Sequence, residues 1–229
     1  MDAPSRRVWA AVAAVVLLAA VVSVLAGHGP KAQGEVPSDA KGQWRITAQQ
    51  RAAGPRFDTR TLAPADRAWI QDAIAGARPE ARPLIEEVDG LVTFVGGHGP
   101  LFLGLTIPDS RGTTIQLNLD YLDYNRKEDR RQTVLHELGH VIDYALLSDR
   151  QDAGFDAGIP RTGQCVSSGD GIAIGACALP RERFADTFAK WALRGAVSIT
   201  GGGYGIPMPP SLETWGAPLT ALGAELRQR

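Results

Sequence analysis

Residues 134–143 read Val-Leu-His-Glu-Leu-Gly-His-Val-Ile-Asp, and they lie in a stretch whose apolar residues recur at helical spacing. The charged residues 126–131 precede this string, and we expect one long helix that continues to about Leu147. The apolar side chains that can pack this helix against the rest of the domain are Leu135, Leu138, Ile142 and Leu146.

His136 and His140 are four residues apart, so a helix places both imidazoles on one face, within reach of one metal ion. Neutral imidazole is a good ligand for zinc. Glu137 follows the first histidine and could take a proton from a water molecule bound to the metal. Because zinc lowers the pKa of such a water to about 7, the pattern predicts a hydrolase that works at neutral pH.

A catalytic zinc site needs a third protein ligand, and a second predicted helix at residues 181–194 offers one. Pro180 starts this helix and Gly195 ends it. Glu182 and Asp186 are four residues apart and share a face. We expect Glu182 to bind the metal and Asp186 to accept a hydrogen bond from a ligand histidine, which would fix the tautomer of that histidine.

Asp143 is an alternative third ligand, since it comes three residues after His140 and on nearly the same face. Three ligands from two consecutive turns of one straight helix converge poorly on a tetrahedral ion. We therefore expect Asp143 to support the helix or to hydrogen-bond a ligand, and not to bind the metal itself.

The string His-Glu-Leu-Gly-His with Asp143, followed by Glu182-Arg-Phe-Ala-Asp-Thr-Phe, resembles the zinc peptidases of the anthrax lethal factor type. That group also includes secreted Pro-Pro endopeptidases. It belongs to the gluzincins, in which a glutamate on a later helix is the third zinc ligand. The resemblance covers residues 130–194, and it implies the two histidines and Glu182 as zinc ligands with Glu137 as the base.

One feature of that family is missing from this chain. Its members usually carry a tyrosine about two helical turns before the ligand glutamate, and this tyrosine is aimed at the oxyanion. The corresponding position here is near Gly175, where there is no tyrosine. Tyr204, in a glycine-rich stretch, and His98, between two predicted strands, are candidates for stabilising the oxyanion, although either could also be structural or simply exposed.

Three strand-like runs precede the motif helix, at residues 91–95, 101–106 and 113–119. Residues 96–100 and 108–112 are rich in turn-forming residues, which favours a hairpin between each pair of successive strands. The run at 113–119 alternates apolar and polar side chains, which is typical of a strand with one wet face. We expect this strand to line the cleft and to pair at its edge with an extended peptide.

Helices are also expected at residues 62–77 and 82–88, before the strands. Residues 148–179 are polar and glycine-rich, and we expect them to form a long loop with a functional role. A last helix is expected to begin near Ser211 and to break at residues 216–218, which read Gly-Ala-Pro.

Cys165 and Cys177 are the two cysteines of the chain. Outside the cytoplasm such a pair forms a disulfide more often than a metal site, and its spacing is too long for a Cys-x-x-Cys knuckle. Closing a loop of this size would stabilise the fold by roughly 3 kcal/mol in the chain-entropy model. Two free buried thiols are the alternative.

Residues 8–27 read VWAAVAAVVLLAAVVSVLAG and contain no charge. A helix of this length spans about 30 Å, the thickness of the hydrocarbon core of a bilayer. Arg6 and Arg7 precede it, which predicts an N-terminus inside the cell and a domain outside the cytoplasm. We therefore expect residues 1–27 to be a retained signal anchor, with a cleaved signal peptide and secretion as the alternative, and residues 28–43 to be a linker.

Residues 44–229 are predicted to form one α+β, zincin-like metallopeptidase domain, with a small twisted sheet, the motif helix and the helix that brings Glu182. Apolar residues make up 44% of the chain and charged residues 21%, and the formal net charge of −1 gives no field that would attract nucleic acid. We expect a zinc-dependent endopeptidase that acts on peptide or protein substrates. The alternatives are a non-catalytic domain that binds zinc or peptides, and a secreted toxin or effector protease.

Overall fold

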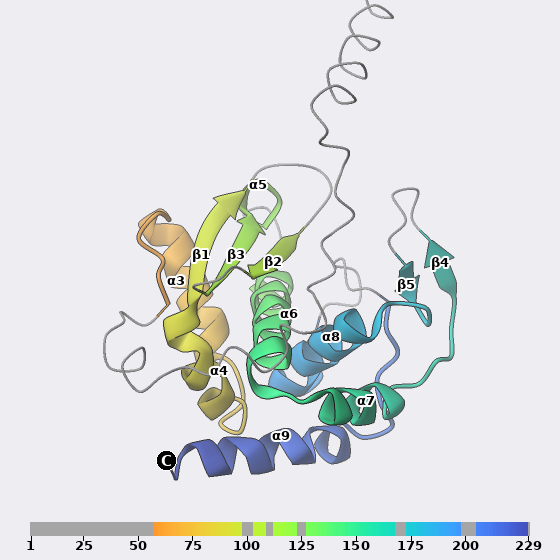
Figure 1. The fold of residues 1–229 in the computed structure, drawn as a ribbon. Helices are drawn as coiled ribbons and strands as arrows, with labels where there is room; N and C mark the ends of the chain where they lie inside the picture. The colour runs from red at the N-terminus through yellow and green to blue at the C-terminus, as the bar shows by residue number, and fades with distance from the viewer. Residues whose placement is uncertain are drawn as a thin grey trace, which may run out of the picture. The chain divides into compact units, whose positions relative to one another are not determined.

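The His-Glu-Leu-Gly-His string lies in helix α6 (Lys127–Leu146), which runs through the middle of the computed structural model (Figure 1). The sheet of strands β1, β2 and β3 lies on one side of α6 and helix α8 on the other. The structure describes residues 57–97, 103–108, 112–122, 127–167, 173–197 and 205–228, which all belong to one compact unit. The predicted anchor, the predicted linker, His98 and Tyr204 lie outside the described residues.

The described part of the chain is α+β, as predicted, with seven α-helices and a small mixed sheet of three strands. The other helices are α3 (Pro64–Ala75), α4 (Arg82–Val88), α5 (Leu119–Leu122), α7 (Asp149–Ala157), α8 (Pro180–Ala192) and α9 (Leu212–Leu226), with a 3-10 turn η2 (Asp89–Leu91) after α4. The strands are β1 (Val92–Gly97), β2 (Gly104–Pro108), β3 (Thr113–Asn118), β4 (Cys165–Ser167) and β5 (Ala173–Gly175).

The three-stranded sheet has the strand order β1-β3-β2. Strand β2 pairs antiparallel with β3, so the hairpin expected between these two strands is confirmed. The hairpin expected between β1 and β2 is wrong, because β3 lies between them and runs parallel to β1. Turn-forming residues show where the chain reverses, but they do not determine which strand the next one pairs with.

Strand β3 alternates as expected, with Thr113, Ile115 and Leu117 buried and the residues between them half-buried. Both of its edges are paired, so the expectation that an extended peptide adds to β3 is wrong. Strand β2 lies at one edge of the three-stranded sheet, next to β3. Within the described residues, the edge of β2 that faces away from β3 has no strand partner.

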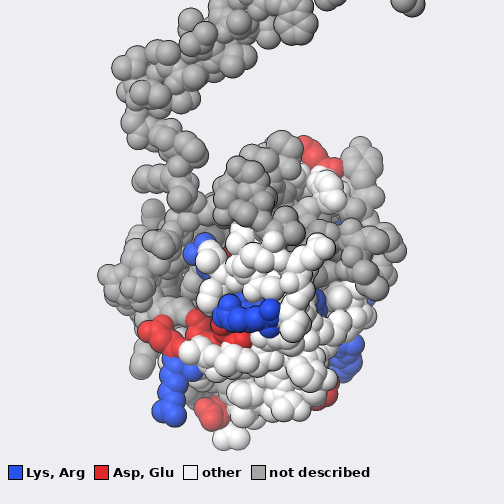
Figure 2. Space-filling model, turned by 90° about the vertical axis from the view of Figure 1, so that its right-hand side faces the viewer, with Lys and Arg blue, Asp and Glu red and all other residues white. Residues whose placement is uncertain are grey.

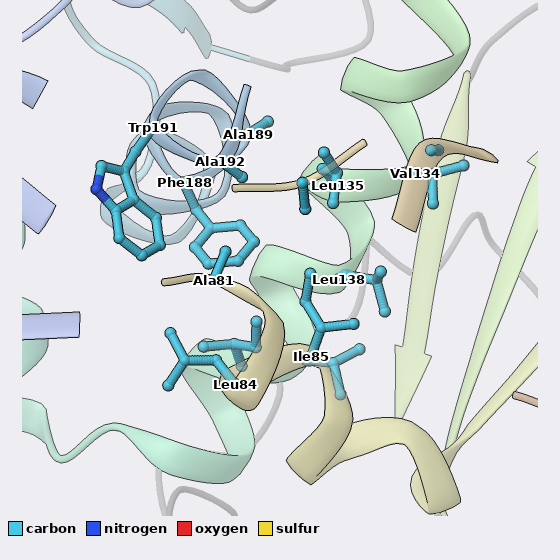
Figure 3. Close-up of a cluster of buried hydrophobic side chains, with 14 of the residues drawn as sticks. Ala81, Leu84, Ile85, Val134, Leu135, Leu138, Phe188, Ala189, Trp191 and Ala192 are labelled. Carbon is cyan, nitrogen blue, oxygen red and sulfur yellow. The ribbon is translucent and has the colours of Figure 1, made fainter. Parts of the chain in front are cut away.

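The hydrophobic core lies where α4, α6 and α8 meet. Figure 3 shows Leu135 and Leu138 of α6 and Phe188 of α8 pointing into one cluster with Leu84 and Ile85 of α4. All five side chains are fully buried. Burying a side chain of this kind contributes about 1.5–3 kcal/mol relative to leaving it exposed. The core therefore fixes the motif helix against α8.

The long loop expected at residues 148–179 is wrong, because the described part of this segment contains α7 and the two-stranded sheet of β4 and β5. Ser148 and Gln151 form a capping box at the start of α7. Phe155 of α7 is buried and packs against Phe184 of α8 and Trp215 of α9. Because α7 has one buried apolar residue, its sequence shows no helical periodicity of apolar residues.

Cys165 and Cys177 are joined in a disulfide, as predicted, with their Cα atoms 5.2 Å apart. The bond links the first residue of β4 to the turn that follows β5. Helix α8 begins three residues after Cys177, so the disulfide closes the hairpin that leads directly into the helix of Glu182.

Helix α9 begins after Ser211, whose hydroxyl accepts a hydrogen bond from the third residue of the helix. The break expected at residues 216–218 is wrong, because the helix continues through Pro218. Trp215 is buried, and Gly216 lies so close to Trp191 of α8 that a Cβ atom there would overlap the indole ring. The packing of Trp215 and Gly216, just before Pro218, therefore outweighs the cost of proline inside a helix, about 3 kcal/mol.

The surface in Figure 2 shows charges of both signs on the described part of that face, in small groups separated by uncharged residues. No helix among the described residues is long and apolar enough to cross a bilayer. The uncharged run at residues 8–27, which the prediction of an anchor concerns, lies outside them.

Candidate metal site

Helices α6 and α8 carry the site, and a glycine lets them approach closely. Gly139 lies between the two motif histidines, and a Cβ atom at this position would stand 3.0 Å from the Cα of Ala185 in α8. Since a side chain would hold the helices farther apart, Gly139 allows α8 to bring Glu182 over the histidine face of α6.

Three potential ligand atoms converge at this point. The Nε2 atoms of His136 and His140 are 3.2 Å apart. Oε2 of Glu182 is 3.4 Å from Nε2 of His136 and 3.3 Å from Nε2 of His140. The two imidazole planes are nearly perpendicular, at 85°. These three residues form a group that could hold one metal ion.

The group is shielded from solvent, with His136 and His140 buried and Glu182 largely so. Oε2 of Glu182 is buried, and its polar neighbours in the described part of the chain are the two histidine nitrogens, at 3.3 and 3.4 Å. Burying a charged carboxylate oxygen without a short hydrogen bond is costly, about 1–3 kcal/mol or more. A bound cation would offset this cost.

The electrostatics of the metal-free site favour a proton where a metal would bind. Burial favours the neutral form of Glu182, but His140 and His136 hold the pKa of its carboxyl far below the usual range. Burial also disfavours a charged His136, yet Glu182, with the charges of Glu137 and Asp186, holds the pKa of that imidazole above its ordinary value. A metal ion that binds the neutral imidazole of His136 therefore competes with a proton.

Asp186 and Asp143 are both buried. Asp186 pairs with Lys190 one turn later and accepts a 3.4 Å hydrogen bond from Nε2 of Gln132. Its charge helps to raise the pKa of His136, while the expected hydrogen bond to a ligand histidine stays a prediction. Asp143 is not a member of the metal-ligand group, which favours Glu182 as the third ligand.

Glu137 lies against the edge strand β2. Oγ1 of Thr106 is 2.7 Å from Oε2 of Glu137 and 3.2 Å from its backbone carbonyl oxygen. Gly104 precedes Thr106 by two residues and lies on the same face of β2. A Cβ atom at Gly104 would stand 2.5 Å from Oε1 of Glu137. Sequence analysis missed both residues of β2, because their contact with Glu137 depends on the strand order.

Tyr144 and Arg181 also border the site and were not expected. The ring of Tyr144 stacks on that of His140, with centroids 6.3 Å apart and planes at 16°. Burial raises the pKa of Tyr144 to about 12, so its phenol keeps its proton at neutral pH. Nε of Arg181 is 3.5 Å from Oε1 of Glu182. Helical spacing could have found Tyr144, since it comes one turn after His140.

The tyrosine that the family resemblance would place near Gly175 has no counterpart there. Gly175 ends β5 with a positive φ of 75°, and a Cβ atom would stand 2.1 Å from the carbonyl oxygen of Gln164. A tyrosine does not fit this backbone. The two alternative candidates, Tyr204 and His98, lie outside the described residues.

Comparison with protein-family models, with curated proteins and with solved structures found no match to this chain. The likeness to peptidases of the lethal factor type accordingly depends on the two short strings around His136 and Glu182. We therefore infer a function from the geometry of the chain's own residues.

Proposed function

We propose that this chain is a zinc-dependent endopeptidase with a zincin-like domain and the ligand set of a gluzincin. The observation that supports this most is the triangle of Nε2 of His136, Nε2 of His140 and Oε2 of Glu182, with edges of 3.2, 3.3 and 3.4 Å. Ligands placed tetrahedrally at about 2.0–2.1 Å from a zinc ion are about 3.3 Å apart. The triangle therefore suits three ligands of one zinc ion, with a fourth position for water or substrate.

The chemistry of the donors also favours zinc. Two imidazole nitrogens and one carboxylate oxygen make a common zinc donor set, whereas calcium and magnesium prefer oxygen ligands throughout. Glu182 is the one carboxylate of the group. Its low pKa keeps it ionised and ready to bind a cation at neutral pH.

In this proposal, Glu137 acts as the general base. When bound, zinc would polarise the carbonyl of the scissile bond and acidify a water molecule. Glu137 would take the proton of the attacking water and pass it to the leaving amine. Its position supports both steps, because Glu137 follows a ligand histidine and its buried carboxylate is held against the neighbouring strand.

We propose that the substrate is an extended peptide. It pairs with the edge of β2 that has no strand partner among the described residues, and not with β3. Strand β2 supports this because two of its residues, Gly104 and Thr106, lie against Glu137. A peptide added along β2 would therefore run past the base.

We also propose that the domain works outside the cytoplasm, with residues 1–27 as a membrane anchor. The Cys165–Cys177 disulfide supports an oxidising compartment. The uncharged run at residues 8–27 and the two arginines before it support the anchor and its orientation.

Zinc content and peptide cleavage test the function in the full chain. We expect one zinc per wild-type chain, and loss of the metal in Glu182→Ala. Glu137→Gln should keep the zinc but no longer cleave a peptide library. Glu225→Gln, an exposed glutamate of α9, is the matched control and should keep both properties.

Two results would contradict the proposal in different ways. A wild-type chain that takes up no zinc, even after incubation with the metal, would exclude the metal site. A chain that binds zinc and cleaves no peptide would support a non-catalytic zinc-binding domain instead. Zinc retained in Glu182→Ala would direct attention to Asp143 or Asp186 as the ligand.

A further inference from the structure

The hydroxyl of Thr106 lies between two acceptors of one residue. Oγ1 is 2.7 Å from Oε2 of Glu137 and 3.2 Å from the backbone carbonyl oxygen of the same residue. A threonine hydroxyl has a single proton to donate. The shorter contact is with the carboxylate, at the length typical of a charge-assisted O–H···O⁻ hydrogen bond. Thr106 therefore donates its proton to Glu137.

We propose that Thr106 is a positioning residue for the base, an inference that rests on the proposed function. Its hydrogen bond holds Oε2 of Glu137 against β2, which leaves Oε1 as the oxygen that meets the attacking water. A glutamate side chain has three rotatable bonds, so the helix alone fixes only where the side chain begins. The backbone carbonyl oxygen of Glu137 lies 3.2 Å from the same hydroxyl, so Thr106 lies close to the backbone of α6 as well as to the carboxylate.

Gly104 leaves the space that the side chain of Glu137 occupies beside β2. A Cβ atom at this position would stand 2.5 Å from Oε1, 2.6 Å from Cγ and 2.7 Å from Cδ of Glu137. Non-bonded carbon and oxygen atoms do not approach this closely, so any side chain at Gly104 would displace the carboxylate. Strand β2 thus holds one carboxylate oxygen through Thr106 and leaves space for the rest of the side chain at Gly104.

The test compares Thr106→Val, Thr106→Ser and Thr114→Val in the full, zinc-loaded chain. Valine keeps the shape of threonine without the hydroxyl, and serine keeps the hydroxyl. Thr114 of β3 is the matched control. It is half-buried, and its side chain lies on the face of the same sheet opposite to that of its buried neighbour Ile115. Each variant is measured for zinc content, for kcat and KM on a peptide that the wild type cleaves, and for affinity for acetohydroxamate.

Acetohydroxamate gives a readout that does not depend on turnover. It binds zinc through its two oxygens and gives up a proton as it binds, so its affinity depends on a correctly placed base. We expect Thr106→Val to lower kcat by about tenfold to a hundredfold, with KM changed less than about threefold. We also expect it to weaken acetohydroxamate binding by about tenfold, with zinc content unchanged. Thr106→Ser should recover most of both losses.

A second variant, Gly104→Ala, tests the same proposal if Thr106→Val misfolds. Gly104→Ala should lower kcat and acetohydroxamate affinity in the same pattern, because its methyl group displaces the carboxylate. The proposal is overturned if Thr106→Val matches wild type and Thr114→Val in both readouts, or if it loses zinc together with activity. If the wild type binds zinc but cleaves no peptide, the proposed function fails, and the acetohydroxamate comparison still decides the role of Thr106. If it binds no zinc, both proposals fail.

Discussion

Gly139 of α6 packs against the backbone of Ala185 in α8, so closely that a Cβ atom at Gly139 would stand 3.0 Å from the Cα of Ala185. Gly139 lies between His136 and His140, and Ala185 lies three residues after Glu182. The contact therefore sets the distance between the two helices at the point where all three candidate metal ligands meet.

Substitution of Gly139 should weaken the site without changing a ligand. Gly139→Ala pushes α8 away by a few tenths of an ångström or more, and we expect zinc affinity to fall by about tenfold with a loss of stability of about 1–3 kcal/mol. Competition with a chelator measures the affinity and denaturant unfolding the stability.

Gly154→Ala is the control for that substitution. Gly154 is also helical, in α7, but a Cβ atom there would meet nothing within 4 Å. We expect this variant to gain about 0.5–1 kcal/mol and to bind zinc as the wild type does. Equal zinc affinity in Gly139→Ala and Gly154→Ala would show that the contact between Gly139 and Ala185 does not set the ligand spacing.

Zinc binding should weaken as the pH falls, and the weakening should begin at a higher pH than for a site with an unperturbed histidine. His136 binds zinc only as neutral imidazole, and its pKa in the metal-free protein is above the ordinary value because of the negative charges around it. The proton therefore begins to compete at a pH above about 6.5, the value for an unperturbed histidine. Zinc dissociation constants measured from pH 5.5 to 8 test this expectation. Affinity that stays constant down to pH 6 would contradict it.

Removal of the metal should destabilise the fold, because zinc binds the folded site and not the separated ligands of an unfolded chain. At a free zinc concentration of about 100 times the dissociation constant, the metal adds about 2.7 kcal/mol of stability. For a domain of this size we expect a chelator to lower Tm by about 5–10 °C. Calorimetry with and without the chelator measures the shift, and Glu182→Ala should show little of it. An equal shift in both proteins would indicate zinc bound at another site.

The elements that sequence analysis predicted best are those specified by residues close together in the chain. The limits of α6 and α8 follow from the charged stretch, Pro180, Gly195 and the spacing of apolar residues. The shared face of His136 and His140 also follows from a local pattern, since one turn of helix separates them, whereas their convergence with Glu182 depends on the packing of α8 against α6.

The features that it missed depend on contacts between distant segments. The strand order β1-β3-β2 decides that Thr106 lies against Glu137, and no local pattern specifies that order. Helix α7 is held by Phe155, whose partner Trp215 is 60 residues away. The same indole anchors α9 just before Pro218, which is why the helix does not break there.

The disulfide should contribute stability more than metal affinity. Cys165 and Cys177 close a loop with a sequence separation of 12, which constrains the unfolded chain and contributes roughly 3 kcal/mol in the chain-entropy model. We expect Cys165→Ser combined with Cys177→Ser to lower Tm by about 6–12 °C. Zinc affinity should change less than about threefold, because the buried Phe184 and Phe188 hold α8 in place independently of the hairpin. Loss of zinc in the double variant at a temperature where it is still folded would show instead that the hairpin positions Glu182.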